Sequence, residues 1–428
     1  MLVVAGSLLA PGAAEAGARC FGRRVTIVGT RGDDLIVGTA GDDAIDGLRG
    51  FDRIRGLGGD DRICGGGESD FVRGGGGDDA IEGAGGSDTA HGGPGADRIV
   101  LGAGGVEGLF GGPGDDRLFG GSGSFDGLIG GAGDDLLHGG RGQDLAEFFG
   151  APNGVRADLE AGTATGQGED RLVATEGLVG SNFDDVLLGD AISNLIVAQQ
   201  GDDVVDARGS GTLEGLGADL MDGGGGDDVL EGDAGADIVT FEDAPVPVTV
   251  DVTLGTATGW GDDSLSGIEA IVGSSFDDAL TGDAQDNAFA AGTGDDAIDG
   301  RGGTDQAAYF DAAGSVVADL RAGVTTGWGT DTLLGVEDLT GSRSADTLTG
   351  DDGPNAIVGG SGPDLLVGAA GDDLLVGAEG NDQVDGGDGL DTCDAETELA
   401  CEVDPVPTRT RVGGWLASWG NRRVERPA

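Results

Sequence analysis

A nine-residue repeat restricts the folding of this chain more than any other feature of its sequence. Three consecutive units are Gly29-Thr-Arg-Gly-Asp-Asp-Leu-Ile-Val37, Gly38-Thr-Ala-Gly-Asp-Asp-Ala-Ile-Asp46 and Gly47-Leu-Arg-Gly-Phe-Asp-Arg-Ile-Arg55. They share the template G-G-x-G-x-D-x-U-x, where U is apolar, and eight units run without a gap from Gly29 to Val100. Self-similarity at a short fixed period is typical of a solenoid, in which each repeat packs only on its neighbours.

Composition argues against an ordinary globular core. Glycine supplies 94 of the 428 residues and aromatic residues only 4%, so any core must be thin and repetitive. The formal net charge is −56, which disfavours a nucleic-acid partner and makes metal cations the natural counter-ions. A disordered chain would also fit this composition, but the regular spacing of the acidic residues argues against it.

The repeats fall into four blocks separated by three segments of equal length. Residues 148–179, 241–272 and 309–340 each span 32 positions, and each contains a short motif such as Gly255-Thr-Ala-Thr-Gly259 after an alternating stretch such as Val248–Val252. Alternation of this kind predicts strands. We therefore expect strand-rich inserts that continue the solenoid, and regard a flexible linker as the weaker alternative. The second unit after each insert carries asparagine in place of aspartate, at Asn194, Asn287 and Asn355.

The repeat units resemble the haemolysin-type (RTX) calcium-binding repeat family. Units beginning at Gly111, Gly223 and Gly359 fit nearly every template position, and the resemblance covers most of residues 25–394. It implies an all-β fold, a right-handed parallel β-roll or β-helix solenoid in which two nonapeptides make one coil. The apolar residues expected to face inward are Ile36, Ile45, Ile54, Ile63, Val72, Ile81, Ile99, Leu118 and Leu137.

The residue types at each repeat position fit calcium binding. Glycines at the first and fourth positions are expected to adopt positive φ angles and form a tight turn that exposes carbonyl groups. Equivalent aspartates on neighbouring coils would lie about 5 Å apart and repel by about 1–3 kcal/mol per pair. Ca²⁺ accepts about six to eight oxygen ligands in flexible geometry, whereas Mg²⁺ prefers a smaller octahedron. Folding is therefore expected to need multiple Ca²⁺ ions as cofactors.

By resemblance to the family, the ligands are the sixth-position aspartates together with glycine-loop carbonyls. The expected metal ligands are Asp34, Asp43, Asp52, Asp61, Asp70, Asp79, Asp88, Asp97, Asp116, Asp135, Asp144, Asp203, Asp228, Asp237, Asp296, Asp305, Asp364, Asp373, Asp382 and Asp391. Three departures from the template are expected to weaken single sites. Glu68 replaces a fourth-position glycine, Glu107 replaces an aspartate, and an extra residue within 120–129 is expected to displace Asp126.

The start of the chain carries a signal of export, and cysteines lie near both ends of the repeat array. Residues 1–18 combine an apolar stretch with small-x-small cleavage sites, which predicts a secretory signal peptide and a secreted, extracellular protein. Four cysteines fit an oxidising compartment. Pairing Cys20 with Cys64 and Cys393 with Cys401 would staple the two ends of the array, while free thiols or another connectivity remain open. No later segment is apolar enough to span a membrane.

Other signals are weaker. His91 and His138 occupy outward positions without zinc-protease spacing, so they are expected to be surface residues and the chain no enzyme. Trp260 and Trp328 recur at one place in two inserts and are expected to pack against a coil, with stacking on a sugar as the alternative. The basic tail after Thr408 predicts an amphipathic helix that caps the solenoid, stays disordered, or serves in membrane contact or export.

The sequence thus predicts a secreted, non-catalytic calcium-binding protein with a structural or interaction role. A carbohydrate-binding or surface-adhesive protein, with cell-surface or matrix glycans as partners, and a calcium buffer are the alternatives. The expected organisation is a signal peptide (1–18), a repeat block with an N-terminal cap (19–147), an insert (148–179), repeats (180–240), an insert (241–272), repeats (273–308), an insert (309–340), repeats (341–394) and a C-terminal cap with a basic tail (395–428).

Overall fold

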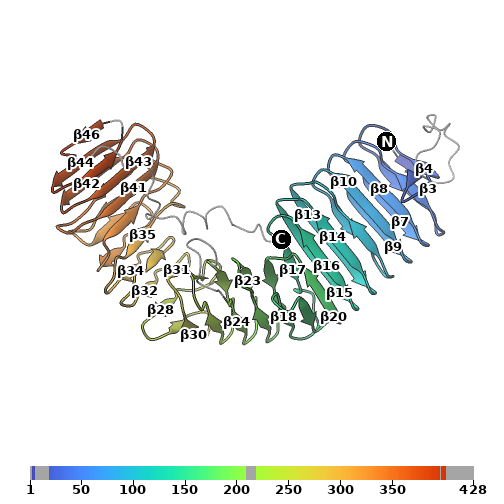
Figure 1. Ribbon diagram of the computed structural model, residues 1–428, viewed down its shortest axis with the longest axis horizontal. Coiled ribbons are helices and arrows are strands. Elements are labelled where there is room, and N and C mark those ends of the chain that lie inside the picture. Colours follow the sequence, from blue (N-terminus) through green and yellow to red (C-terminus); the bar gives the residue numbers. More distant parts are fainter. Residues whose placement is uncertain (1, 5–18, 209–217, 396, 402–428) are drawn as a thin grey trace. The chain divides into compact units, whose positions relative to one another are not determined.

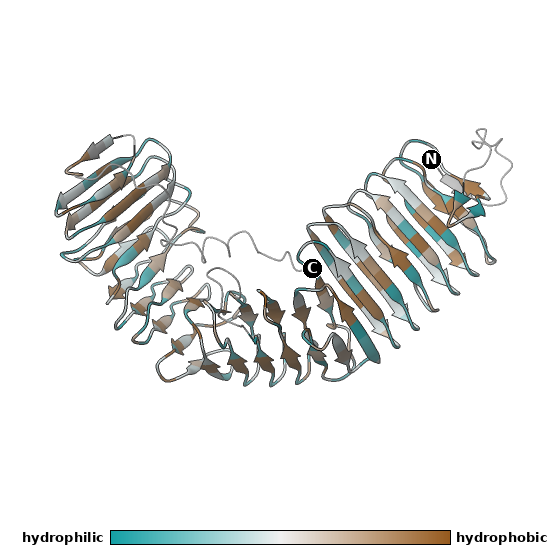
Figure 2. Ribbon diagram, viewed as in Figure 1, coloured by the Kyte–Doolittle hydropathy of each residue, from teal (hydrophilic) through white to brown (hydrophobic). Residues whose placement is uncertain are grey.

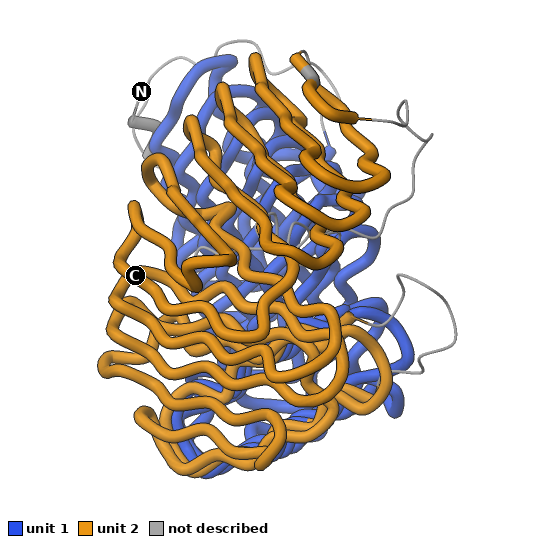
Figure 3. Tube along the Cα trace, turned by 90° about the vertical axis from the view of Figure 1, so that its left-hand side faces the viewer, with its two compact units in different colours: residues 1–205 blue, residues 206–428 orange. Residues whose placement is uncertain are grey.

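The computed structural model describes residues 2–4, 19–208, 218–395 and 397–401, and within these ranges the chain consists of strands and turns without a helix (Figure 1). This confirms the all-β prediction. The chain divides into two compact units, Met1–Val205 and Asp206–Ala428 (Figure 3). In the described part of the chain, no helix has the length and apolar character needed to cross a membrane.

Each coil of the first unit contributes one strand to each of two parallel sheets. Ile36 pairs with Ile54 in the first sheet and Ile45 with Ile63 in the second, so strands that lie side by side are two nonapeptides apart. The first sheet contains β1 (Leu2–Val4), β5 (Leu35–Val37), β7 (Arg53–Gly58), β9 (Phe71–Gly76), β11 (Thr89–His91), β13 (Val106–Pro113), β15 (Phe125–Ala132), β17 (Leu145–Glu147), β21 (Gly177–Val179) and β23 (Leu195–Val197). The second contains β4 (Ile27–Val28), β6 (Ala44–Asp46), β8 (Arg62–Gly67), β10 (Ala80–Gly85), β12 (Arg98–Val100), β14 (Arg117–Gly121), β16 (Leu136–Gly140), β18 (Arg156–Asp158), β19 (Thr163–Thr165), β20 (Glu169–Val173), β22 (Val186–Leu188) and β24 (Val204–Asp206).

The second unit repeats the same two-sheet plan. Its first sheet contains β25 (Leu220–Asp222), β27 (Ile238–Thr240), β31 (Ala270–Val272), β33 (Ala288–Ala290), β35 (Gln306–Ala308), β39 (Asp338–Thr340), β41 (Ala356–Ser361), β43 (Leu374–Glu379) and β45 (Thr392–Asp394). Its second sheet contains β26 (Val229–Glu231), β28 (Thr249–Asp251), β29 (Thr256–Thr258), β30 (Asp262–Ser266), β32 (Ala279–Thr281), β34 (Ala297–Asp299), β36 (Val317–Asp319), β37 (Val324–Thr326), β38 (Thr332–Leu334), β40 (Thr347–Thr349), β42 (Leu365–Ala370), β44 (Gln383–Asp388) and β46 (Thr397–Leu399).

The core of each unit is a stack of single side chains between its two sheets. Because side chains alternate along a strand, the middle residue of each x-U-x segment points inward and its two neighbours point outward. All nine residues that the sequence analysis placed inside are completely buried, which confirms that prediction. Figure 2 shows hydrophobic residues recurring along the successive strands of each unit.

Each insert adds a three-stranded antiparallel segment to the second sheet, as predicted for strand-rich inserts. In the first insert β18 pairs antiparallel with β19, and β19 with β20. The outer two of these strands then join the neighbouring coils, β20 on β16 and β18 on β22, in parallel. In the first sheet, β17 pairs directly with β21. The other two inserts follow the same order of strands.

Two disulfides close the ends of the described chain in the predicted pairs, Cys20–Cys64 and Cys393–Cys401. A short hairpin of β2 (Arg19–Cys20) and β3 (Arg23–Arg24) carries the first cysteine. Most of the predicted signal peptide and the whole predicted tail helix lie outside the described residues.

Candidate metal centres

The backbone conformation of the turns brings an aspartate carboxylate oxygen close to a main-chain carbonyl oxygen of the next coil. The second and fourth positions of a unit, such as Leu57 (φ 88°) and Gly59 (φ 99°), adopt left-handed backbone conformations, whereas the first-position glycines do not. The prediction for the first position was therefore wrong. Glycine is needed there because a Cβ at Gly38 would lie 2.5 Å from the carbonyl oxygen of Gly56 and 2.8 Å from Oδ2 of Asp43.

One carboxylate oxygen of each sixth-position aspartate holds neighbouring coils in register. Oδ1 of Asp52 accepts a hydrogen bond from the backbone N–H of Asp34 at 2.8 Å, and Oδ1 of Asp61 accepts one from Asp43 at 2.8 Å. Two ladders of such bonds follow the turns of the first unit. One ladder runs through Asp34, Asp52, Asp70 and Asp88, and the other through Asp43, Asp61, Asp79, Asp97, Asp116 and Asp135.

The second oxygen of many of these carboxylates is buried and accepts no hydrogen bond. This holds for Oδ2 of Asp52, Asp61, Asp70, Asp79, Asp88, Asp97, Asp116, Asp135, Asp144, Asp237, Asp296, Asp305, Asp364 and Asp373. At Gly56, the added Cβ would collide with both Oδ2 of Asp61 and the carbonyl oxygen of Gly74 on the next coil. A buried oxygen without a partner is costly, and carboxylate plus carbonyl oxygen is the donor set that Ca²⁺ prefers.

Main-chain carbonyls would have to complete each coordination shell. Within the described ranges, no group of three or more His, Cys, Asp and Glu side chains is arranged to hold a metal ion. A site between two coils therefore offers few carboxylates and depends on the carbonyls that the glycine-rich turn exposes. The residues present fit a hard, oxygen-seeking cation with flexible geometry.

Burial makes these carboxylates difficult to ionise without a cation. It raises the pKa of Asp79 from 3.8 to about 7, against the opposing effect of the hydrogen bond from Asp61, while the charges of Asp61, Asp60 and Asp78 add to the rise. Burial likewise raises the pKa of Asp97 to about 7. A divalent cation between the coils would remove this penalty.

A second class of turn satisfies its carboxylate within the protein. In these turns the second position is serine or threonine, whereas glycine, alanine or leucine is common there in the turns with an unsatisfied oxygen. Both oxygens of Asp278 accept from Ser274, whose hydroxyl lies 2.8 Å from Oδ1 and whose N–H lies 2.6 Å from Oδ2. Asp185 and Asp346 are held in the same way, and Thr39 donates both its N–H and its hydroxyl to Oδ2 of Asp43. Of these, only Asp43 was among the expected metal ligands.

In the asparagine unit that follows each insert, the neutral side-chain oxygen of asparagine accepts the hydrogen bond that a carboxylate accepts in the serine and threonine turns. The side-chain oxygen of Asn287 accepts from the N–H of Asp283 at 2.7 Å, and Asn355 accepts from Asp351 at 2.8 Å. The first two turns after an insert, one with serine and one with asparagine, are therefore held by protein hydrogen bonds.

All twenty expected ligands lie in the turns and are buried. Sequence reasoning missed the acidic residues of the inserts, which occupy further rungs of the ladders. The N–H of Asp144 donates to Glu176 at 3.0 Å and that of Asp135 to Asp170 at 3.0 Å. Corresponding rungs in the second unit end on Glu269, Glu337, Asp263 and Asp331. Their recurrence at one position in each insert was the signal that could have found them.

The expected displacement of Asp126 was wrong. Asp126 is completely buried, and its Oδ2 faces Gly120 and the carbonyl oxygen of Gly139, as in an ordinary unit. The extra residue is accommodated because the coil before it carries one too, so that Glu107 pairs in register with Asp126. Neither carboxylate has a hydrogen-bond partner on either oxygen, and burial raises the pKa of Glu107 to about 8.

The two histidines lie in aromatic contacts. His91 stacks on Phe110 with ring centroids 4.3 Å apart and also contacts Phe71, while His138 contacts Phe119. Burial and the neighbouring charge of Arg73 lower the pKa of His91. Both histidines therefore belong to rows of rings on the outside of the strands.

The comparisons with known proteins agree with this geometry. A search of curated proteins found no match to the chain. The family model of the RTX calcium-binding nonapeptide repeat matches residues 26–54, 37–72, 73–105, 109–124, 125–146, 179–209, 215–242, 272–307, 333–366 and 358–393. These matches cover more than half of the sequence and include the turns whose buried aspartates have just been described. The chain therefore belongs to the RTX calcium-binding nonapeptide repeat family.

Proposed function

We propose that this chain is a secreted protein that folds when it binds Ca²⁺ outside the cell and then serves a structural or interaction role without catalysis. The observation that carries the proposal is the series of buried aspartate Oδ2 atoms that have no hydrogen-bond partner and face main-chain carbonyls. In the absence of a divalent ion these oxygens oppose folding, and with one they bridge successive coils.

The proposed ligands are the sixth-position aspartates of turns whose second position carries no hydroxyl group, such as Leu57 in the turn of Asp61. They include Asp61, Asp79 and Asp97 on one ladder and Asp52 and Asp70 on the other. Turns with serine or threonine at the second position, such as that of Asp278, are proposed to fold without bound metal. We also propose the division into four repeat blocks and three inserts, in which the first two turns after each insert are held by protein hydrogen bonds and the turns that follow depend on metal.

The test is a calcium titration followed by far-ultraviolet circular dichroism. In EDTA the β-sheet signal should be lost, and millimolar Ca²⁺ should restore it cooperatively, because binding to the folded state alone shifts the folding equilibrium. Mg²⁺ at the same concentration serves as the control for charge screening and should restore less signal. Equal spectra in EDTA and in Ca²⁺ would refute the proposal.

A further inference from the structure

The outer side of the first sheet, in the first unit, carries arginine side chains that have no counter-ion in the protein. Exposed and buried residues alternate along β7, so Arg53 and Arg55 point outward. Arg73 points outward from β9, which lies beside β7 (Figure 1). Among the residues that the structure describes, none of these three arginines forms an ion pair, whereas Arg301 in the second unit pairs with Asp251 at 3.1 Å. Three positive charges are therefore left for an external partner.

The three arginines lie close together. Arg55 and Arg73 are directly opposite in the parallel register, and neighbouring strands are about 4.8 Å apart. Arg53 lies on the same side of β7, two residues or about 7 Å from Arg55. Like charges at this separation repel. The guanidinium of Arg73 lies over the Phe71 ring, 5.0 Å from its centroid, which holds it in place and leaves its N–H groups exposed at the edge. The cluster favours an oxyanion such as phosphate.

Exposed apolar side chains flank the arginines at both ends of the same coil. Phe51, in the turn before β7, is 60% exposed, and Leu57, beyond Arg55 in β7, is 52% exposed. The outward residues of this coil thus follow the order apolar, basic, basic, apolar over about 20 Å. A soluble phosphate would use only the middle of this line. A phospholipid bilayer offers phosphate groups at its surface and acyl chains directly beneath them.

This outer side is also free of acidic groups, although 79 of the 428 residues are acidic. The outward-facing residues of β7, β9, β11 and β13 include no aspartate or glutamate, and the exposed acids of the adjoining turns, Asp33 and Glu68, lie at its border. The second sheet differs, because Asp60 and Asp78 are exposed in the turns that lead into it and Glu82 points outward from β10. The remaining negative charge is largely screened beyond about 8 Å at physiological salt.

We propose that this outer side of β7 and β9 binds the surface of a negatively charged phospholipid bilayer. Arg53, Arg55 and Arg73 donate to headgroup phosphates, while Phe51 and Leu57 enter the boundary between headgroups and acyl chains. The inference rests on the proposed function only in that Ca²⁺ must fold the first unit. Circular dichroism distinguishes a chain that does not fold from one that folds and does not bind.

The experiment measures sedimentation of the full chain with sucrose-loaded vesicles at saturating Ca²⁺. Wild type should bind vesicles made of equal parts of phosphatidylcholine and phosphatidylglycerol, and should bind phosphatidylcholine vesicles much more weakly. Replacing Arg53, Arg55 and Arg73 together by glutamine should weaken binding to the charged vesicles roughly hundredfold. Phe51→Ala should weaken it roughly tenfold, because the ring no longer leaves water.

The matched control removes three arginines from the outer side of the second sheet. Arg62, Arg98 and Arg117 occupy the corresponding strand position in β8, β12 and β14. Replacing all three by glutamine changes the net charge by the same amount and should leave vesicle binding unchanged. Circular dichroism at the same Ca²⁺ concentration checks each variant. If a triple variant loses its β-sheet signal, the single substitution Arg55→Gln, expected to weaken binding roughly fivefold, replaces it.

Three outcomes would overturn the proposal. The first is equal binding to charged and neutral vesicles. The second is equal weakening by the two triple variants, which would assign binding to the net charge or to Ca²⁺ ions that bridge the acidic turns to the lipid. The third is a Phe51→Ala variant that binds vesicles as wild type does while heparin binds through the three arginines of the first sheet, which would assign this surface to an acidic polysaccharide.

Discussion

Replacing Asp61 with asparagine should stabilise the chain at low calcium and destabilise it at high calcium. Oδ1 of Asp61 accepts the N–H of Asp43 at 2.8 Å, a bond that an asparagine oxygen can keep. Oδ2 is buried without a partner beside the carbonyl of Gly74, where an amide N–H could donate. The substitution therefore removes a buried charge and one proposed metal ligand without removing the rung of the ladder.

The free-energy cost of burying the Asp61 charge and the free energy gained from binding one Ca²⁺ ion are similar in size. Burial, together with the charges of Asp43, Asp42 and Asp60, raises the pKa of Asp61 from 3.8 to about 6. That rise corresponds to about 3 kcal/mol of folding free energy lost at neutral pH when the group is ionised. Binding of one Ca²⁺ ion, at a free Ca²⁺ concentration of about 100 times its Kd, stabilises the folded state by about 2.7 kcal/mol. The stability curves of wild type and Asp61→Asn should therefore cross near a Ca²⁺ concentration of about 100 Kd.

The assay is urea unfolding of both proteins over a series of Ca²⁺ concentrations, with bound calcium counted by equilibrium dialysis. Asp278→Asn is the matched control, because Ser274 already satisfies that carboxylate and a charge-assisted hydrogen bond is lost. Because burial raises the pKa of Asp278 as well, and no proposed metal ligand is removed, the change in stability should be the same at every Ca²⁺ concentration and the two curves should not cross. If Asp61→Asn is less stable throughout the series, or binds as much calcium as wild type, the reasoning is wrong.

Three further predictions concern a glycine of the turns, the pH dependence of folding and the first disulfide. Gly56→Ala should raise the Ca²⁺ concentration needed for folding, because the added methyl group occupies the space between a carboxylate and a carbonyl oxygen; an unchanged midpoint in the circular dichroism titration would contradict this. Because burial raises the pKa of Asp79 and Asp97 to about 7, the folded state in EDTA holds protons that the unfolded chain releases between about pH 4 and 7. The β-sheet circular dichroism signal in EDTA should therefore return as the pH falls from about 7 towards 4 and be lost as the pH rises through about 7; a signal that stays flat or increases with pH would count against the shift. Replacing both Cys20 and Cys64 by serine should lower the unfolding free energy in Ca²⁺ by about 4 kcal/mol, because the bond spans 44 positions of the chain; a loss below about 1 kcal/mol would show that the first coils are held without it.

Much of the fold could be predicted from the sequence because a solenoid makes spatial order follow chain order. Ile36, Ile45 and Ile54 follow one another at intervals of one repeat unit. Neighbouring strands pair residues that are two repeat units apart, such as Ile36 and Ile54. A single repeated interval therefore predicted the buried row and the acidic turns. The cysteine pairs followed from the same logic, because each pair brackets an end of the array.

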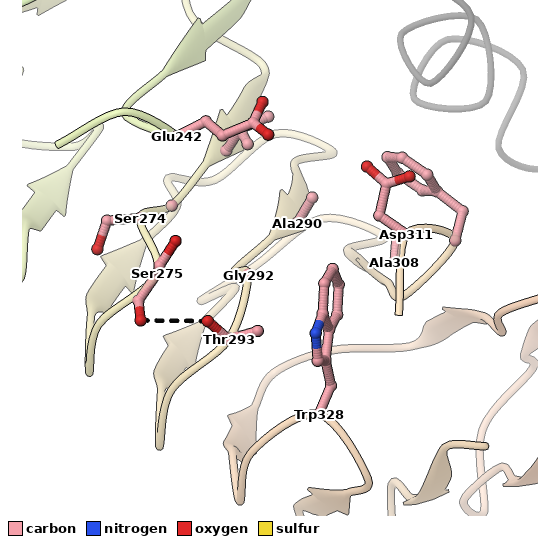
Figure 4. Close-up of a pocket in the computed structure, with 12 residues that line it drawn as sticks. Glu242, Ser274, Ser275, Ala290, Gly292, Thr293, Ala308, Asp311 and Trp328 are labelled. Atoms are coloured by element: carbon pink, nitrogen blue, oxygen red, sulfur yellow. Dashed lines mark hydrogen bonds between the residues drawn. The ribbon is translucent and has the colours of Figure 1, made fainter. Parts of the chain in front are cut away.

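The strand-turn alternation, the inward residues and the positions of the acidic turns could all be predicted from the chain, since they depend on local spacing. The stacking of coils was needed to show that one oxygen of Asp61 accepts an N–H from the preceding coil and leaves the other oxygen buried. Asp61 and Asp278 occupy the same repeat position, and the hydroxyl of Ser274, four residues earlier in the same unit, satisfies Asp278, whereas Oδ2 of Asp61 is buried without a partner. The surroundings of Trp328 likewise required folding, because Glu242, more than eighty positions earlier, lines the same small cavity only when successive coils stack (Figure 4). Contacts within a unit follow from its residues, whereas contacts between coils depend on how the turns project once the ladder has formed.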